Sequence, residues 1–581
     1  MPFSRLGKIG TALVWTALAV TLAFHLWAAR RGLEMTDEAS YLLIALDPWH
    51  TWGHGTFHGF LLRPLYLFAG SSVVGLRWIG YAILLAAAWR LAGAVGLHLG
   101  SPRRRLAALC APVLMVAALT CYSAGMRTPC YNWMILVGAL WMWSGWLRCR
   151  REPFGPWELG LGLAIALIGK WGAALVLFGL LVSLSRLTKG KMWGPSRKEW
   201  GQAAAAFAVA IGLIAFYAGG NGILDTLRAG ILIAQTTGSH GWFIVPKYGW
   251  EIFYYLYRIG RAFVWLVPPI LAFWWLARRD PKKWTIEKIV TILFLAGFSL
   301  AALRGWWRGG IEQFGKESVL AGCWLLGVVW TVWAVRRKMD DGGQWPEAGV
   351  RGTEVGVPCL VLWALVLTPF LCGIGTNTSI ADYAGQGTVF FAAAGILLLG
   401  SVSPAVLPTA PIVALTGLCL IQGSRVSTSL LGLYRVGSVL HQTELLDQGP
   451  EAKKLQVDPQ TAREIHDLAR LLSTSGFRAG DPVVGVDSLC GWVYLSGATS
   501  PGVPWFFRDQ GSYLSAVLSL VDPAVLRRTW VWLRSSSHFQ EMTEWWPTAV
   551  VPPPFCRAGQ IILETDRGRE PMVVIRPPFL P

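Results

Sequence analysis

Long apolar runs alternate with short basic clusters from the start of the chain to residue 424, after which the sequence becomes mixed and polar. A helix needs about 20 apolar residues to cross the hydrocarbon core of a bilayer. By that measure the runs predict spans at 9–29, 74–99, 104–125, 130–147, 158–169, 171–186, 200–219, 260–277, 286–303, 316–335, 357–374, 384–400 and 404–424. The predicted fold class is therefore mainly α, a polytopic membrane protein with about 13 transmembrane helices.

The basic clusters between the spans test this topology, because loops rich in Lys and Arg stay preferentially in the cytoplasm. With the N-terminus inside, the clusters at 103–105, 148–151, 186–198, 278–283 and 336–338 all fall on the cytoplasmic side. A single span over 158–183 would put two of these clusters on opposite faces. The pattern therefore predicts a short hairpin with its apex at Gly169-Lys170-Trp171. This arrangement surrounds Lys170 with helices, where a charge is a candidate functional group.

The polar sequence after residue 424 predicts a second domain. It contains a helical pattern over 461–473, a strand pattern over 482–487, a helix–strand pair over 523–534 and a hairpin over 560–575. We therefore divide the chain into a transmembrane catalytic domain (1–424), with external loops at 30–73 and 220–259, and an extracytoplasmic α/β domain (425–581). Cys490 and Cys556 are the cysteines of this outer domain, and an oxidising compartment would permit a disulfide between them. The sequence leaves that pairing open.

Composition excludes an ordinary soluble protein, since 54% of the residues are hydrophobic and the mean hydropathy is +0.46. The net charge of +18 could indicate a nucleic-acid partner. However, the Lys and Arg residues fall in short clusters between apolar runs, which is the distribution that membrane orientation requires. No nucleic-acid partner is therefore predicted.

An acidic pair lies just beyond the first span, where Asp37 and Glu38 are followed by Tyr41. Only 14% of the residues are charged, so carboxylates at a membrane boundary need a chemical reason. Asp37 is the leading candidate for a catalytic residue. The structural alternative is an N-cap and first-turn acid of a surface helix over 39–46, and the two roles are compatible.

Several basic residues fall on the predicted outer side, against the usual charge preference. Some could contact lipid headgroups or pair with Glu251 and Glu312. Others could form a cradle for a phosphate opposite the acidic pair. The cations in question are Arg63, Arg127, Lys170, Lys247, Arg258, Arg261, Arg304 and Arg308. Together with an external carboxylate, they suit a substrate made of a lipid phosphate and a group to be transferred from it.

The segment Asp37-Glu38-Ala39-Ser40-Tyr41 resembles the acidic motif that opens the first external loop of GT-C glycosyltransferases, membrane enzymes that use polyprenyl-phosphate sugars. The nearest pattern is that of bacterial lipid A aminoarabinose transferases, with protein O-mannosyltransferases more distant. Further similar segments follow in the expected order at 63–66, 127–132 and 167–170. The segment at 63–66 departs from the family pattern, because Arg63 replaces a Lys and one Pro is missing.

The resemblance implies an inverting transfer of a hexosyl or pentosyl group from a polyprenyl-phosphate donor to an envelope lipid, glycan or protein. Asp37 would be the base. Glu38 would orient the acceptor or raise the pKa of its neighbour. The donor phosphate would contact Arg63, Arg127, Lys170, Arg304 and Arg308. The implied location is a bacterial inner membrane, with the active site and the C-terminal domain on the periplasmic side.

Further residues are candidates for contact with substrate, namely Tyr41, Tyr131, His58, Trp306 and Trp307. His50, His54 and His58 recur every four residues, a spacing that on a helix would suggest a metal site. Glycines at 53, 55 and 59 argue against a regular helix there, so no metal ligand is predicted. The metal requirement of oligosaccharyltransferase-type relatives keeps a divalent metal open.

Two rival functions need different features. A transporter or flippase of lipid-linked sugars would also use cations near the membrane, but should show inverted repeats and broken helices. The sequence shows no such repeat. A non-catalytic assembly subunit of the same fold would not need a carboxylate pair at the donor site.

Overall fold

The computed structural model describes residues 2–52, 56–98, 104–122, 126–188, 193–237, 244–264, 359–375, 380–402, 438–504, 511–534, 556–565 and 568–577, with the single positions 422, 426 and 546. The predicted spans at 286–303 and 316–335 lie outside these residues. So do residues 265–277 of the span at 260–277, and all of the span at 404–424 except Gln422.

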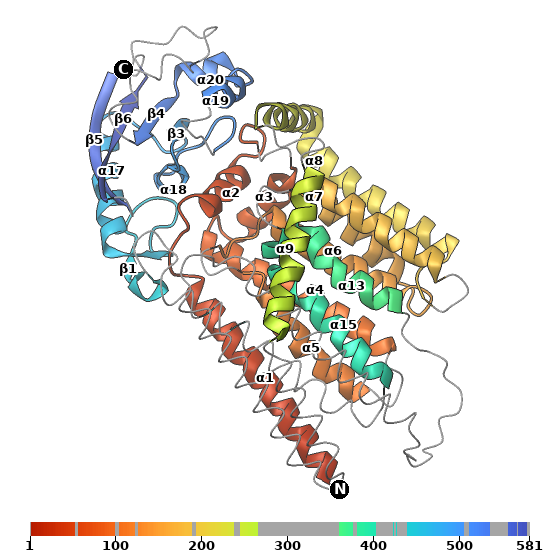
Figure 1. The fold of residues 1–581 in the computed structure, drawn as a ribbon. Coiled ribbons are helices and arrows are strands. Elements are labelled where there is room, and N and C mark those ends of the chain that lie inside the picture. Colours follow the sequence, from red (N-terminus) through yellow and green to blue (C-terminus); the bar gives the residue numbers. More distant parts are fainter. Residues whose placement is uncertain are drawn as a thin grey trace, which may run out of the picture.

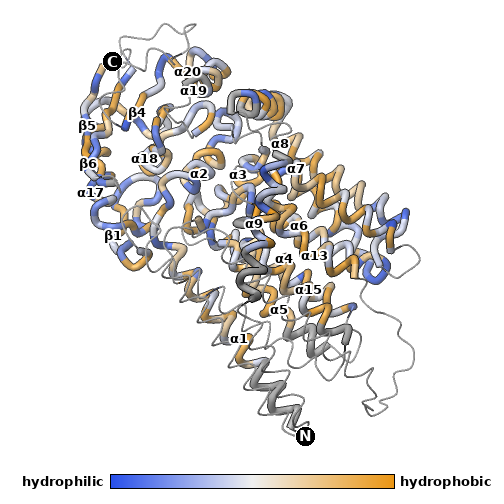
Figure 2. The backbone as a smooth tube through the Cα atoms, in the orientation of Figure 1, coloured by the Kyte–Doolittle hydropathy of each residue, from blue (hydrophilic) through white to orange (hydrophobic). Residues whose placement is uncertain are grey.

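Apolar helices form a membrane body (Figure 1), and their hydropathy distinguishes them from the more polar C-terminal part of the chain (Figure 2). They are α1 (Pro2–Ala28), α4 (Val73–His98), α5 (Arg104–Leu119), α6 (Tyr131–Arg148), α7 (Gly155–Leu187), α8 (Arg197–Thr237), α13 (Cys359–Cys372) and α15 (Thr388–Val402). Among the described residues, four helices are long and apolar enough to cross a membrane. The prediction of a mainly helical membrane protein with a small C-terminal sheet is confirmed.

Helix α7 is a hairpin and not one continuous span. Lys170 has non-helical dihedral angles (φ −155°, ψ 84°) and separates two arms. Gly145 of α6 packs on Leu159 of the first arm, while the neighbouring Trp146 donates a hydrogen bond from Nε1 to Ser185 Oγ of the second arm (2.8 Å). Both open ends therefore lie beside the same end of α6, and the arms are antiparallel, as the basic clusters predict.

The turn of α7 lies at the opposite end of α6, where Gly169 packs on Tyr131. Close approach along α6 and the first arm depends on glycines: a Cβ on Gly138 would come within 2.6 Å of Gly162 O. Small residues at such positions are typical of helix pairs in membranes. We call the end of the body at the Lys170 turn the domain end, and the end at Arg148 the far end.

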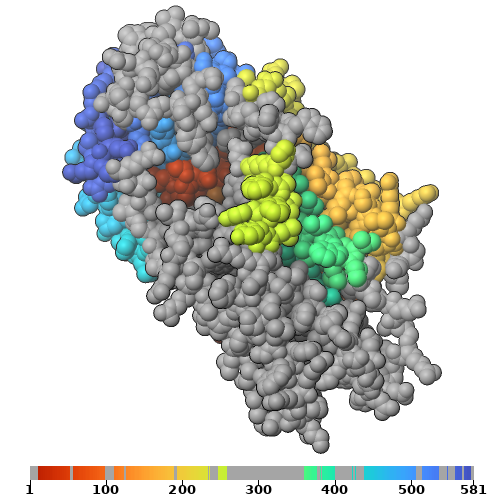
Figure 3. Space-filling view, viewed as in Figure 1, coloured from red at the N-terminus to blue at the C-terminus, as the bar shows by residue number. Residues whose placement is uncertain are grey.

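Short helices cover the domain end. They are α2 (Asp37–Leu46), α3 (His58–Phe68) and α14 (Ile380–Gln386). The longer α9 (Ile244–Val264) runs along the body beside α13 and α14 (Figure 1). Helix α8 changes direction at Gly219, whose φ of 70° favours glycine, and Gly222 then packs on Phe60 of α3. An area of the N-terminal part of the chain is visible between the C-terminal domain and α9 (Figure 3).

The C-terminal domain is built on a four-stranded sheet in the order β3-β4-β6-β5. The strands are β3 (Val483–Val486), β4 (Trp530–Arg534), β5 (Cys556–Thr565) and β6 (Gly568–Arg576). Strands β3 and β4 are parallel, and β6 is antiparallel to both β4 and β5. A two-stranded sheet of β1 (Glu444–Leu445) and β2 (Gln456–Val457) lies before it.

Helices cover both faces of the sheet because its strands alternate two apolar sets. Trp530 and Trp532 share a core with α17 (Pro459–Thr474), α18 (Cys490–Leu495) and α2. Val531 and Leu533 share the opposite core with α19 (Gly511–Leu518) and α20 (Pro523–Arg527). The helix, strands and hairpin expected from the sequence are all present. Cys490 is buried and Cys556 exposed, and both are free, so the possible disulfide is not formed.

The C-terminal domain holds the loop that follows α1. Backbone hydrogen bonds join Gln456 N to Arg30 O (2.8 Å) and Gly491 N to Met35 O (2.8 Å) before α2. After α2, Trp52 N donates to Gly502 O (2.5 Å). The domain therefore fixes both ends of the segment 30–52, which contains Asp37 and Glu38 and is called the acidic segment below.

A buried carboxylate connects the domain to α4. Glu451 accepts hydrogen bonds from Val73 N (2.6 Å), Ser72 Oγ (3.1 Å) and Tyr494 Oη (2.6 Å). Tyr494 Oη also lies 3.0 Å from Tyr66 Oη of α3. Val73 is the first residue of α4, so the carboxylate satisfies an amide that the helix itself cannot pair.

Replacing this carboxylate should loosen the docking of the domain. We expect Glu451→Ala to lower the free energy of unfolding by about 1–3 kcal/mol, because buried donors lose their acceptor. Chemical unfolding of the purified protein in mild detergent measures this. The exposed Glu444→Ala is the control and should leave stability unchanged; an equal effect of the two variants would contradict the assignment.

Candidate active site

The acidic segment begins with two glutamates that cap one another. Glu34 Oε2 accepts from Glu38 N (2.9 Å), and Glu38 Oε2 accepts from Glu34 N (3.0 Å). Glu34 Oε1 also accepts from Thr36 Oγ1 (2.5 Å). The amides at the start of α2 are thus paired with a residue that the sequence did not single out. The expected capping role does not fall to the side chain of Asp37.

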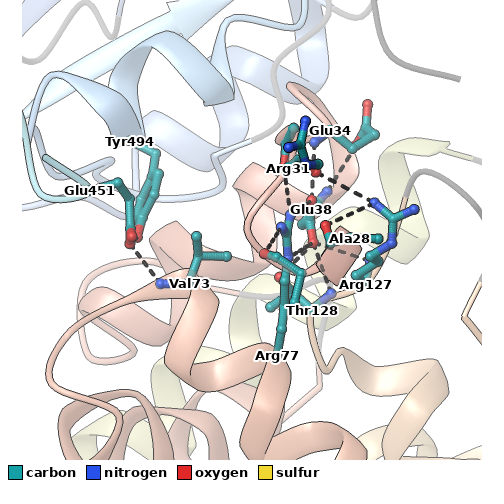
Figure 4. A network of polar contacts seen from close by, with 12 residues as sticks. Ala28, Arg31, Glu34, Glu38, Val73, Arg77, Arg127, Thr128, Glu451 and Tyr494 are labelled. Atoms are coloured by element: carbon teal, nitrogen blue, oxygen red, sulfur yellow. Dashed lines mark hydrogen bonds and ion pairs between the residues drawn. The ribbon is translucent and has the colours of Figure 1, made fainter. Parts of the chain in front are cut away.

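Glu38 is fully buried in a network with α4 and the segment before α6 (Figure 4). Arg77 donates to it twice, from Nε to Oε1 (3.0 Å) and from Nη2 to Oε2 (2.6 Å). Thr128 donates from both its amide (2.8 Å) and its hydroxyl (2.6 Å) to Oε1. Burial alone would raise the pKa of Glu38, but the charge and hydrogen bonds of Arg77 outweigh it and lower the pKa.

Arg77 is itself buried. Two further hydrogen bonds run from its guanidinium to Ala29 O (2.7 Å) and Gly32 O (2.9 Å), just after α1. One guanidinium thus joins the end of α1, the start of α2 and the body of α4. Arg77 lies inside a predicted span, and its position as an intramembrane charge is the signal by which sequence reading could have found it.

Asp37 is in a different state from its neighbour. Its Oδ1 is buried and accepts no hydrogen bond from the described residues. Burial raises the pKa of Asp37 to about 7, and the charge of Glu34 acts in the same direction. The carboxylate that raises the pKa of Asp37 is Glu34. The resemblance offered Glu38 for this effect, with orientation of the acceptor as its alternative role. A carboxyl with this pKa and an open acceptor is suited to take a proton near neutral pH.

A cluster of aromatic side chains lies near this carboxyl, which interacts electrostatically with Tyr41 and Tyr131. The ring of Tyr41 lies 5.5 Å from that of Tyr131 and 5.7 Å from that of His58, between ring centroids. His58 is buried and its Nδ1 lies 2.6 Å from Thr56 Oγ1. The structure thus brings together the three predicted contact candidates Tyr41, Tyr131 and His58.

Lys170 reaches the same cluster from the turn of α7. Its Nζ donates to Cys372 O (3.0 Å) and lies over the rings of Tyr383 (4.4 Å) and Tyr131 (5.6 Å). Asp37 and Lys170 both interact electrostatically with Cys130, so both groups lie near this side chain. Tyr383, which sequence reasoning missed, also accepts from Asn132 Nδ2 (2.9 Å).

The other predicted phosphate ligands are distributed more widely. Arg127 is buried, its amide donates to Glu38 Oε1 (3.1 Å), and its guanidinium lies 3.5 Å from the carbonyls of Ala28 and Arg31. Arg63 is half-buried, with its guanidinium 5.4 Å from the Trp49 ring centroid. Arg304, Arg308, Trp306 and Trp307 lie outside the described residues.

The histidines of the first loop do not converge. His50 is exposed and pairs with Asp47 (2.9 Å), whereas His58 joins the aromatic cluster. His54 lies outside the described residues. Within the part of the chain that the structure describes, no three His, Cys, Asp or Glu side chains could hold a metal ion together.

The chain matches no family model and no curated protein sequence. It is similar to two crystal structures of ArnT from Cupriavidus metallidurans. The structure in the apo state has a TM-score of 0.38 and 12% identity, and the structure bound to undecaprenyl phosphate has a TM-score of 0.35 and 13% identity. Each match covers 97% of this chain and 98% of that chain. Because these identities and scores are low, the function is argued from the site itself.

Proposed function

We propose that the protein is a membrane glycosyltransferase that moves a sugar from a polyprenyl-phosphate donor to an acceptor on the extracytoplasmic side of the membrane. The observation that carries this proposal is that two adjacent carboxylates differ in hydrogen bonding and in pKa. Glu38 is saturated and ionised, whereas Asp37 keeps an open buried oxygen and a pKa of about 7. Pairs of carboxyls whose environments separate their pKa values are typical of acid–base catalysis.

Asp37 is the proposed base. The acceptor hydroxyl or amine gives its proton to an Asp37 carboxylate oxygen while its oxygen or nitrogen attacks the anomeric carbon. The bond between that carbon and the phosphate oxygen breaks, and its electron pair leaves with the polyprenyl phosphate. One displacement of this kind inverts the anomeric centre.

Glu38 is proposed to position this base without touching substrate. Its two oxygens accept hydrogen bonds from protein donors, including Arg77 and Thr128. They fix the first turn of α2, in which Asp37 lies. The protein groups that hold Glu38 thereby set the direction of the Asp37 side chain.

Lys170 is the proposed contact for the leaving phosphate. An ammonium has three donors, and one of them is used by Cys372 O. The rings of Tyr131 and Tyr383 restrain the side chain by cation–π contact. A charge that is held in place before reaction stabilises a leaving anion without reorganisation.

Removing this charge should weaken donor binding. We expect Lys170→Met to reduce affinity for polyprenyl phosphate about 10- to 100-fold, the value of a hydrogen bond to a charged group. Lys170→Arg should retain part of the affinity. Equilibrium binding of labelled polyprenyl phosphate to the purified protein measures this, with the exposed Lys454→Met as control; undiminished binding by Lys170→Met would remove Lys170 from the site.

A transporter of lipid-linked sugars is the second candidate, because α7 is broken at a buried lysine. Reconstituted vesicles separate the two functions. Polyprenyl-phosphate sugars labelled in the sugar are added with envelope fractions as acceptors. Formation of a labelled acceptor with release of polyprenyl phosphate supports the transferase; movement of intact donor across the vesicle without any labelled acceptor supports the transporter.

A further inference from the structure

A groove opens at the far end of the membrane body and runs along the α7 hairpin toward its turn. It has a volume of about 890 Å³ and runs between the two arms of α7 and the first part of α8. Apolar side chains line most of it, including Leu163, Leu167, Leu175, Phe178, Val182 and Phe207. These residues belong to candidate membrane spans, so the groove lies at the depth of lipid chains.

One end of this groove is basic. Arg150, Arg186 and Arg197 line it together with Ser185 and Ser196. All three arginines are exposed. The carboxylate nearby is Glu199, which accepts hydrogen bonds from the amides of Arg150 and Ser196.

The guanidinium groups keep a net positive charge at this end. Within the residues that the structure describes, no carboxylate lies within ion-pair distance of Arg186 or Arg197. The groove therefore combines an apolar channel with cations at its mouth. This combination complements a molecule with a phosphate headgroup and an acyl chain.

The basic mouth of the groove lies far from the candidate active site. The arm of α7 from 155 to 169 is about 22 Å long at 1.5 Å per residue. Arg150 and Ser185 lie at its open end, and Lys170 lies at its turn. The headgroup of a ligand in the groove would therefore bind at the open end of the hairpin, while its chain would lie along the two arms.

We propose that this groove binds an anionic phospholipid of the surrounding membrane. Its phosphate contacts Arg186 and Arg197, and an acyl chain lies between the arms of α7 and α8. The bound lipid joins the open ends of the hairpin and so stabilises the helix pair that carries Lys170. This inference does not depend on the proposed sugar transfer.

The test uses full-length protein in mild detergent and measures lipid binding by native mass spectrometry and thermal unfolding. We expect phosphatidylglycerol to bind and to raise the unfolding temperature more than phosphatidylcholine with the same chains. Because each arginine near a membrane surface contributes about a fivefold gain in affinity for anionic lipid, Arg186→Ala/Arg197→Ala should bind about 25-fold more weakly. The charge-conserving pair Arg186→Lys/Arg197→Lys should bind nearly as well as wild type.

A second variant tests the apolar part independently. Ala204 lines the groove and is exposed, so Ala204→Trp should fill it and reduce lipid binding without a change in charge. Arg463→Ala/Arg470→Ala, on α17, is the matched control. The proposal is overturned if phosphatidylcholine binds equally well, if glycerol phosphate without chains binds as tightly, or if neither groove variant weakens phosphatidylglycerol binding.

Discussion

Asp37→Asn is expected to lower the turnover number of sugar transfer about 10²- to 10⁴-fold, the usual contribution of a positioned general base. The amide is nearly the same size as the carboxyl, so the packing of α2 should not change. The amide of the Asn side chain cannot take up the proton that the acceptor substrate must lose. Binding of the donor should be retained, because the leaving phosphate is assigned to cations. Single-turnover transfer of labelled sugar by the purified variant measures the effect.

The matched control is Asp47→Asn, at the other end of the same helix. Asp47 follows α2 and pairs with the exposed His50, away from the aromatic cluster. Its substitution should change turnover less than about twofold, since an exposed pair contributes little. Equal losses in the two variants would show that Asp37 acts through the stability of α2 and not as a base.

Arg77→Met is expected to lower the free energy of unfolding by about 3–5 kcal/mol, the largest effect on stability in this account. The reason is that Glu38 has no exposed surface and would be left as a buried charge without its partner. Loss of the contacts to Ala29 O and Gly32 O adds to the effect. Chemical unfolding in mild detergent is the measurement.

Two further variants separate this ion pair from simple packing. Arg77→Met/Glu38→Gln removes both charges and should recover much of the lost stability. Arg228→Met, on α8, breaks an exposed pair with Asp225 and should cost about 1 kcal/mol or less. A double variant as unstable as Arg77→Met would mean that the buried charge of Glu38 is not the cause.

The helices and the α7 hairpin could be predicted because they depend on local patterns. Apolar runs define the spans, and two basic clusters that must share one side force a turn at Lys170. The C-terminal strands were predicted for the same reason, since their alternation is visible within a few residues. Each of these inferences needed only the sequence near the element itself.

The division between Asp37 and Glu38 could not be predicted, because two adjacent carboxyls look equivalent in a sequence. What separates them is their partners: Arg77 is 39 residues from Glu38, and Thr128 is 90 residues away. Tyr383, which contacts Lys170 and Asn132, lies still further along the chain. Contacts between side chains so far apart in the sequence depend on how the helices pack, and the local sequence pattern does not predict that packing.

The docking of the C-terminal domain was also beyond sequence patterns. The sequence around Glu451 predicts an ordinary surface residue. In the structure its carboxylate is buried against Ser72, 379 residues away, and against Val73, 378 residues away. Backbone contacts from the same domain hold both ends of the acidic loop. The domain is therefore placed to fix the geometry of the segment that carries Asp37.

The most direct test of the central claim is the pH dependence of sugar transfer from a polyprenyl-phosphate donor by wild type and by Asp37→Asn. Asp37 must be ionised to accept a proton, and its pKa is raised to about 7. Wild-type kcat/KM should therefore be at its plateau above pH 8 and fall as the pH drops through 7, while Asp37→Asn stays low throughout and still binds donor. A wild-type rate that does not change between pH 5.5 and 8, or transfer by Asp37→Asn at the wild-type rate, would contradict the assignment of Asp37 as the base.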